Sequence, residues 1–301
     1  MNEAIRVEGL TYRPGRGFAL RDISLSVPTG SVYGFLGPNG AGKTTTIKLI
    51  LGLLETRQGE IRCLGQRIPH AAHKALARIG YVPEAPHLYQ SLKVSQAIQY
   101  HSAFYETWDT ALARQLLGKF ELREHQRLSG LSKGEQRKLM ILLALAQRPT
   151  LLMLDEPTDG LDPVVRREIL DALRESVEHE GTTVFVSSHL VHELEGICDW
   201  VAVVDRGSVV AQMPMVDFRD RIKLLQVSGN EEIDADAPFE VLRRSGSAGT
   251  EGGQEWVVSG WQPGMREYFA ARGAAVKGVV DLSLEDGFVE LLRSFRRSEG
   301  R

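Results

Sequence analysis

One stretch of the sequence combines glycines, a lysine and hydroxyl side chains at a spacing that suits a bound phosphate. The pattern is glycine, four residues, glycine, lysine and threonine, in the order Gly37, Pro38, Asn39, Gly40, Ala41, Gly42, Lys43, Thr44 and then Thr45. Glycines let the backbone wrap tightly, so that successive N–H groups point at one anion. Lys43 can reach the terminal phosphates of a nucleotide, and the Thr44 hydroxyl can ligate Mg²⁺. The motif predicts a nucleoside triphosphate site and disfavours a glycine-rich turn that binds nothing.

The segments on either side of this motif predict a strand before it and a helix after it. Residues 32–36 are a short apolar run, which is typical of a buried strand, and residues 44–51 have the composition of a helix. The N-terminus of a helix carries a partial positive charge, which favours an anion there. Strand, loop and helix therefore predict the same phosphate position.

Two acids follow a second buried strand. Residues 151–154 are apolar, and Asp155 and Glu156 come directly after them. A carboxylate at the end of such a strand lies where a nucleotide-bound Mg²⁺ is held, and the next acid can polarise the attacking water. A strand that ends in a polar turn explains the two acids in isolation, but their place after a phosphate loop favours catalysis.

A serine and a glycine open another predicted helix, over residues 135–147. Ser132 and Gly134 precede this helix, and a helix start of this kind makes a second concavity for an anion. An ordinary helix cap explains the same residue types, and elementary physical chemistry does not separate the two interpretations.

Composition restricts the class of protein. The 301 residues are 43 % hydrophobic and 25 % charged, with a formal net charge of −3, which is ordinary for a globular chain and gives no reason to expect nucleic acid. Cys63 and Cys198 lack metal-like spacing and read as buried thiols. The longest apolar run, 139–146, is well short of the roughly 20 residues of a membrane span, and the N-terminus has no secretion signal. If the protein serves a membrane process, we expect another chain to supply the membrane part.

The order of predicted elements indicates an α/β fold with a parallel sheet. Strands at 60–64, 78–83, 151–154, 183–186 and 200–204 alternate with helical stretches, and most are continuous apolar runs. Residues 4–8 and 19–27 predict an antiparallel hairpin, and the stretch from about 91 to 147 is mainly helical. After residue 222 the pattern changes to short strands at 224–228, 255–259 and 275–280, a loop at 245–253, and a helix capped by Ser283.

Taken together, these motifs resemble the ATP-binding subunit of ABC transporters over about residues 4–220. The phosphate loop, the serine-glycine segment and Asp155-Glu156 occur in the order and spacing of that family, as do residues 158–162 and Ser187-Ser188-His189. The resemblance implies a P-loop NTPase core with an N-terminal antiparallel β subdomain and a helical signature subdomain at about 88–147. The cassette would cover residues 1–221, and residues 222–301 would form a small α+β C-terminal domain.

The same resemblance implies roles for individual residues. Two cassettes would pack head to tail, so that Ser132 and Gly134 contact the γ-phosphate of ATP held by the phosphate loop of the other. Thr44 and Asp155 would hold Mg²⁺, and Glu156 would act as general base. His189 would contact the γ-phosphate and orient the water.

Three positions depart from the family pattern. Lys133 stands where glycine is usual, with Glu135 in place of glutamine, and Glu84 replaces the glutamine that approaches Mg²⁺. A carboxylate can ligate Mg²⁺ but, when ionised, donates no hydrogen bond. Two aromatics, Tyr12 and Phe18, are candidates for stacking on adenine, of which Tyr12 is preferred.

The function implied is hydrolysis of ATP, with Mg²⁺, by a head-to-tail dimer that powers export through a separate permease of the ABC-2-like kind. The subunit would lie at the cytoplasmic face of the cell membrane, with a homodimeric or paralogous second cassette and no nucleic acid. The alternative is a soluble ABC ATPase that acts on nucleic acid or the ribosome. Residues 88–105 would face the permease, although their aromatics also fit the core of the helical subdomain.

Overall fold

The computed structural model describes residues 2–15, 17–56, 58–86, 88–228, 237–246 and 254–299. The chain divides into two compact units, one made of residues 1–190 with 197–209 and the other of residues 191–196 with 210–301. The domain limits expected at 221 and 222 stay a prediction, because packing in space does not test which residues fold as an independent domain.

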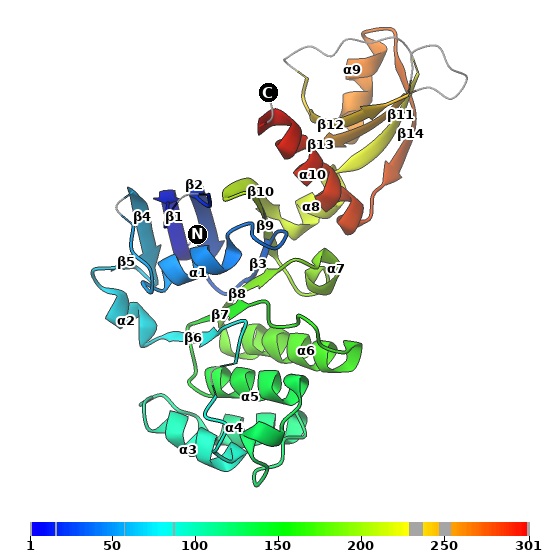
Figure 1. Ribbon diagram of the computed structural model, residues 1–301. Helices are drawn as coiled ribbons and strands as arrows, with labels where there is room; N and C mark the ends of the chain where they lie inside the picture. Colours follow the sequence, from blue (N-terminus) through cyan, green and yellow to red (C-terminus); the bar gives the residue numbers. More distant parts are fainter. Residues whose placement is uncertain are drawn as a thin grey trace. The chain divides into compact units, whose positions relative to one another are not determined.

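The sheet that positions the site has six strands in the order β10-β9-β3-β8-β7-β6 (Figure 1). The pairs β3–β8, β3–β9, β7–β8 and β6–β7 are all parallel, which confirms the predicted parallel sheet. The strands are β3 (Val32–Leu36), β6 (Ile79–Val82), β7 (Leu151–Asp155), β8 (Thr183–Ser188), β9 (Trp200–Asp205) and β10 (Ser208–Pro214). Both β7 and β8 are buried along their whole length, as a strand covered on two faces must be.

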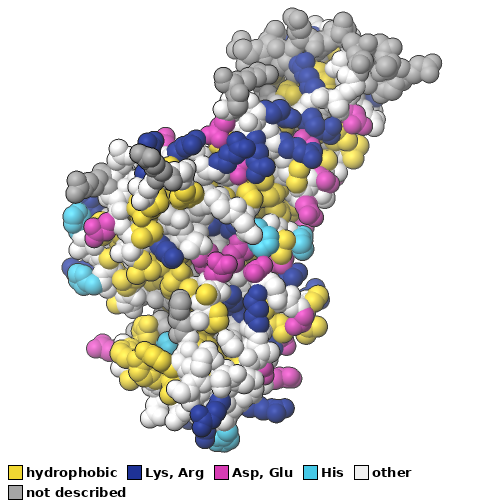
Figure 2. All heavy atoms as spheres, viewed as in Figure 1, with side chains coloured by type: hydrophobic (Ala, Val, Ile, Leu, Met, Phe, Trp, Pro, Cys, Tyr) yellow, Lys and Arg dark blue, Asp and Glu magenta, His cyan; other side chains and the backbone are white. Residues whose placement is uncertain are grey.

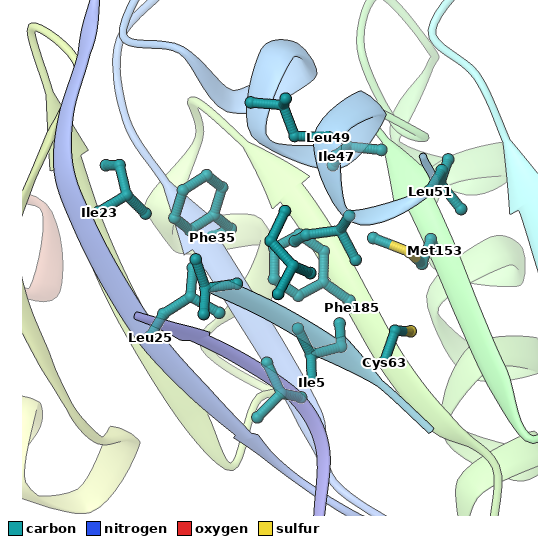
Figure 3. Packing of buried hydrophobic residues seen from close by; sticks show 14 of the residues in the cluster. Ile5, Ile23, Leu25, Phe35, Ile47, Leu49, Leu51, Cys63, Met153 and Phe185 are labelled. Carbon is teal, nitrogen blue, oxygen red and sulfur yellow. The ribbon is translucent and has the colours of Figure 1, made fainter. Parts of the chain in front are cut away.

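A second sheet, antiparallel in the pairs β1–β2, β1–β4 and β4–β5, packs against the first through a shared core. Its strands are β1 (Glu3–Tyr12), β2 (Leu20–Pro28), β4 (Gln58–Cys63) and β5 (Gln66–Ile68). Figure 3 shows Ile5, Ile23 and Leu25 of this sheet facing Phe35 and Phe185 of the parallel sheet. The rings of Phe185 and Phe35, on adjacent strands of the parallel sheet, lie 5.4 Å apart, centroid to centroid, and form part of the apolar surface on which the antiparallel sheet packs.

Helices cover the parallel sheet and extend from it. They are α1 (Lys43–Ile50), α2 (Ala72–Leu76), α3 (Val94–Ser102), α4 (Thr110–Lys119), the 3₁₀ turn η1 (Leu128–Gly130), α5 (Lys133–Leu145) and α6 (Pro163–Glu180). In Figure 1, α5 lies between α6 and α4, and residues 137–145 of α5 are buried throughout. Cys63 and Cys198 are both buried free thiols, and burial raises the pKa of each.

The second unit is a small α+β assembly. Its sheet has the order β12-β13-β11-β14, with antiparallel pairs throughout. The elements are α7 (Val191–Leu194), α8 (Met215–Arg221), β11 (Lys223–Ser228), β12 (Glu240–Ser245), β13 (Gln254–Ser259), η2 (Pro263–Met265), α9 (Arg266–Ala270), β14 (Ala275–Asp281) and α10 (Leu284–Glu299). Its core is aromatic, with Trp256 and Phe269 fully buried.

The predicted strands of this unit are present, and β12 is one that the sequence analysis missed. The Ser283 cap is confirmed, because its Oγ accepts a hydrogen bond of 3.1 Å from the Asp286 N–H at the start of α10. Most of the loop expected at 245–253, from residue 247 on, lies outside the described residues. Among the helices described, none is both long and apolar enough to span a membrane.

Candidate nucleotide site

The phosphate loop joins β3 to α1 and depends on glycine at two points. Gly42 precedes α1 with φ +109°, a conformation that other residues rarely adopt. At Gly37 the limit is space, because a Cβ there would collide with the backbone carbonyl of Val204. The loop is therefore held closely against the end of β9 and turns directly into the helix, which leaves backbone amides at its N-terminus available to an anion.

Lys43, the first residue of α1, places its ammonium in the fold of this loop. Its side chain is only 5 % exposed, and Nζ donates hydrogen bonds to the Gly37 carbonyl at 2.6 Å and the Pro38 carbonyl at 3.1 Å. The same atom lies 2.9 Å from Oε1 of Glu156. A buried ammonium needs such partners, and its three N–H groups can donate to phosphate oxygens that take the place of one of these acceptors.

Glu156 lies between this lysine and a histidine. Its Oε2 is 2.9 Å from Nδ1 of His189, and its backbone N–H donates to the Ser187 hydroxyl at 3.0 Å. The residue has φ +48°, a strained value for a side chain of this size, directly after β7. This turn of the backbone allows one carboxylate to reach residues that follow two different strands.

Asp155 ends β7 with one satisfied and one unsatisfied oxygen. Oδ1 accepts a 2.8 Å hydrogen bond from the Ser187 hydroxyl, whereas Oδ2 is buried and has no hydrogen-bond partner in the described part of the chain. Such an orphaned carboxylate oxygen is costly unless a donor or a cation satisfies it. The half-buried Thr44 supplies a hydroxyl to the neighbouring pocket. A hydroxyl and a carboxylate with room for water and phosphate suit Mg²⁺, so these residues fit the expected ion.

The negative charges at this edge of the sheet also suit a bound cation. Burial, together with the negative charges of Asp155 and Glu84, raises the pKa of Tyr81 on β6 to about 12. The described residues hold no cluster of three or more His, Cys, Asp or Glu side chains that could hold a metal without other ligands. A cation here would therefore depend on the hydroxyl, on water and on the nucleotide as well.

These side chains surround a pocket of about 310 Å³. It is lined by Phe18, Asn39, Gly40, Gly42, Lys43, Thr44, Thr45, Glu84 and Glu156. The structure thus brings together the predicted phosphate loop, Glu84 and the general base, with His189 behind Glu156. The aromatic residue in this lining is Phe18. Tyr12 and Phe18 both pack against the hydrophobic core, but the preferred Tyr12 is not part of the lining described.

Ser132 and Gly134, the ends of what is called the signature segment below (residues 132–134), stand apart from this pocket. Neither belongs to its lining. Ser132 caps α5, since its Oγ accepts from the Glu135 N–H at 3.2 Å while Oε2 of Glu135 accepts from the Ser132 N–H at 2.7 Å. Lys133 lies 3.7 Å from Asp159, whose other oxygen is 3.9 Å from Nε2 of His189. The ordinary cap is therefore present, and within one chain the signature segment does not complete the phosphate site.

Two supporting residues escaped the sequence reasoning. Ser187 was noted as part of a motif, but its hydroxyl also contacts both Asp155 and the Glu156 backbone, and the parallel register of Asp155 with Ser187 was a signal for this. Arg137 hydrogen-bonds the backbone beside Glu84. A charge within the fully buried part of α5 was the signal for a polar partner there.

Known proteins resemble this chain in sequence and in fold. Residues 20–159 match the family described as ABC transporter. The chain is 35 % identical to the Nod factor export ATP-binding protein I of Ralstonia nicotianae, over 69 % of this chain and 66 % of that protein. It is 32 % identical to the bacitracin transport ATP-binding protein BcrA of Bacillus licheniformis, over 73 % of each. The matches therefore span about two thirds to three quarters of these relatives.

A solved structure agrees with the sequence relatives. The structure described as the ATP-binding subunit of an ABC transporter has a TM-score of 0.65 and 30 % identity, covering 72 % of this chain and 92 % of that one. The predicted α/β fold with a P-loop NTPase core is confirmed by this likeness. The chain belongs to the ABC transporter family, as an ATP-binding subunit that hydrolyses ATP to power transport.

Proposed function

We propose that two copies of this chain bind two ATP molecules head to tail and drive export through a separate membrane-spanning permease. The observation that carries the dimer is the separation inside one chain. The pocket holds the phosphate loop and Glu156, whereas Ser132 and Gly134 lie outside it with their helix N-terminus exposed. A γ-phosphate in the pocket would have donors on one side only, and a second chain's signature segment would supply the other side.

A second copy of the same chain is the partner that this sequence favours. One chain carries a full phosphate loop, both carboxylates, His189 and the signature segment. Two copies related by a two-fold axis therefore make two equivalent sites, each with every group present. A soluble ATPase that acts on nucleic acid is not favoured, because the two relatives reported above are named for export and transport and the net charge is −3.

The catalytic roles follow from the contacts of Glu156. With ATP bound, Lys43 turns from Glu156 to the terminal phosphates, and the freed carboxylate accepts a proton from the attacking water. His189, 2.9 Å from Glu156 through Nδ1, keeps that carboxylate in place and has its other ring nitrogen directed away from it. Ser187 holds the backbone of Glu156. These residues act chiefly by positioning the water and neutralising charge.

Mg²⁺ would be held by Thr44 and the free oxygen of Asp155, with Glu84 in the lining of the pocket. When bound, it would neutralise charge that develops on the phosphates. The aromatic that stacks on adenine is Phe18, because it lines the pocket, and Tyr12 does not have this position in the structure described. This assignment replaces the preference for Tyr12.

The permease would bind at an aromatic surface of the helical subdomain. Tyr89 and Phe104 are 64 % and 66 % exposed, and the ring of Tyr100 lies 5.7 Å from Tyr89 and 5.0 Å from Phe104, centroid to centroid. Figure 2 shows hydrophobic side chains gathered at the surface on the side of α3. These aromatics are therefore not the core of the subdomain, and exposed apolar patches of this kind mark interaction sites. Binding there would hold the subunit at the cytoplasmic face of the membrane.

Trapping the dimer tests this proposal. With MgATP, the Glu156→Gln chain should elute in size-exclusion chromatography as a dimer, because ATP is bound and not hydrolysed. The double variant Glu156→Gln with Ser132→Arg should remain a monomer, since the larger side chain blocks the signature segment. A Glu156→Gln chain that stays monomeric with MgATP, or a double variant that dimerises as well, contradicts the head-to-tail arrangement.

A further inference from the structure

Arg137 is a buried cation that binds the backbone of the pocket wall. It lies in α5 and is 3 % exposed. Its Nη1 donates to the Pro83 carbonyl at 2.7 Å, and its Nη2 donates to the Glu84 carbonyl at 2.6 Å. The two carbonyls belong to successive residues just after β6. One planar guanidinium thus holds a two-residue segment of backbone in a single orientation.

The contact is unusual because no carboxylate pairs with this arginine in the described part of the chain. Burial lowers the pKa of Arg137, while the more distant charges of Asp159, Glu84 and Asp155 oppose that effect. A guanidinium without an ion pair in such a place depends on its two hydrogen bonds. If the Pro83–Glu84 segment moved away from α5, the guanidinium of Arg137 would become exposed or would lose its hydrogen-bond partners.

The two ends of this contact reach two functional segments. Glu84, whose carbonyl accepts from Arg137, has an exposed side chain that lines the nucleotide pocket. Five residues before Arg137 on the same helix, Ser132 caps α5 and begins the signature segment. A displacement of α5 is therefore transmitted through one side chain to the wall of the pocket.

We propose that Arg137 is a positioning residue that makes α5 and the Pro83–Glu84 segment move as one body. When Ser132 and Gly134 engage the ATP of the second chain, the position of α5 then sets the position of Glu84 in this chain's own pocket. This coupling rests on the proposed function. The two hydrogen bonds from Arg137 to the Pro83 and Glu84 carbonyls, called the clasp below, are a property of the single chain, and the two are tested separately.

The neighbouring residue supplies a matched control. Lys138 is also buried in α5, but it points elsewhere, with Nζ paired to Glu168 on α6 and 3.4 Å from the Phe120 carbonyl. Replacement of either cation removes one buried charge from the same turn of the same helix. Only Arg137 contacts the segment that carries Glu84.

The clasp is tested on the nucleotide-free chain with a glutamate-specific protease. We expect cleavage after Glu84, followed by mass spectrometry, to be about tenfold faster or more in Arg137→Gln than in the wild type, because local opening exposes the segment. Arg137→Lys should also be cleaved faster, since one amine cannot hold both carbonyls as a planar fork does. Lys138→Met should be cleaved at the wild-type rate. Equal cleavage in Arg137→Gln and the wild type, or in Arg137→Gln and Lys138→Met, overturns the clasp.

The coupling is tested by steady-state ATP hydrolysis in two backgrounds. Arg137→Gln should lower kcat about 10- to 100-fold in the wild-type background, through misplacement of the wall. In the Glu84→Ala background the same change should lower kcat less than about twofold, because the group it positions is gone. Lys138→Met should change kcat by the same factor in the wild-type and the Glu84→Ala backgrounds. Equal losses for Arg137→Gln in both backgrounds overturn the coupling. A wild-type chain without ATPase activity contradicts the proposed function instead, and the protease result still decides the clasp.

Discussion

The carboxylate of Glu156 lies 2.9 Å from the ammonium of Lys43 and 2.9 Å from the imidazole of His189. These residues follow three adjacent strands of one parallel sheet, β3, β7 and β8, whose carboxyl ends meet at one edge. The position of a ligand site at such an edge is a general property of α/β sheets. The positive φ of Glu156 then adds the local strain that turns its side chain toward both neighbours.

Replacing Glu156 with glutamine separates binding from chemistry. We expect kcat for ATP hydrolysis to fall about 10²- to 10⁴-fold, because the amide cannot accept a proton from water. ATP affinity, measured by equilibrium titration, should remain within a few fold, since Lys43 and the loop are intact. Glu178→Gln, an exposed acid on α6, serves as control and should keep the wild-type rate. A turnover in Glu156→Gln equal to that of the control contradicts the role of the carboxylate.

Substitution of Phe18 and of Tyr12 tests which aromatic side chain stacks on adenine. Phe18→Ala should weaken ATP binding about 2- to 10-fold, because an aromatic contact contributes about 0.5–1.5 kcal/mol. Tyr12→Ala should change affinity less than about twofold, because Tyr12 lies outside the described lining. Isothermal titration with ATP distinguishes them. The reverse order of effects would return the stacking role to Tyr12.

At the residue scale, the sequence predicted the site residues that belong to a motif of fixed spacing. It did not predict the residue whose place depends on how distant parts of the chain pack. The phosphate loop, Asp155 and Glu156 needed only their order along the chain. The choice between Tyr12 and Phe18 depended on tertiary packing, because Phe18 lies in the connection between β1 and β2 and reaches the pocket from there. Residue types and spacing do not show which side chain of such a connection faces a pocket.

At the scale of elements, α5 joins three roles in thirteen residues. Its first turn carries the signature segment, Arg137 holds Glu84, and the rest is buried between α4 and α6. The sequence predicted this helix from its cap and apolar content. The direction of Arg137 was not predictable, because it depends on which helix face meets the end of β6.

The second unit shows why some strands escape prediction. The sequence of β12 contains only two apolar residues, Val241 and Leu242, so it lacks a clear alternation. Its charges are satisfied by partners distant in sequence, since Arg243 lies 3.2 Å from the buried Glu290 of α10 and Arg244 lies over the ring of Trp256. Such partners are known only once the chain has folded.

The aromatic core of this unit makes a stability prediction. Trp256 is fully buried and its ring lies 5.4 Å from that of Phe269, so Trp256→Ala should cost about 3–5 kcal/mol. In urea unfolding followed by circular dichroism, the transition of the second unit should move to lower urea. Val280→Ala, at an exposed position of β14, should change stability by less than about 0.5 kcal/mol. Equal effects of the two substitutions would mean that Trp256 is not a core residue.

At the scale of the whole molecule, the nucleotide pocket and the signature segment lie in different places. Lys43 and Glu156 line the pocket. Ser132 and Gly134 lie at the N-terminus of α5 and do not line it. The resemblance named the family correctly, and the fold confirms it.

The central claim, that each ATP site is shared between two copies, is tested most directly by mixing two inactive variants. Lys43→Ala removes the phosphate-loop lysine, and Ser132→Ala removes the hydroxyl of the signature segment without adding bulk that would block pairing. Each variant alone should be inactive, because both of its sites carry one defect. In a mixed dimer both defects fall in one site and the other site is intact. An equimolar mixture should therefore recover about a quarter of the wild-type ATPase rate, since half of the randomly paired dimers have one working site of two. A mixture no more active than the separate variants would show that the site is not completed by a second copy.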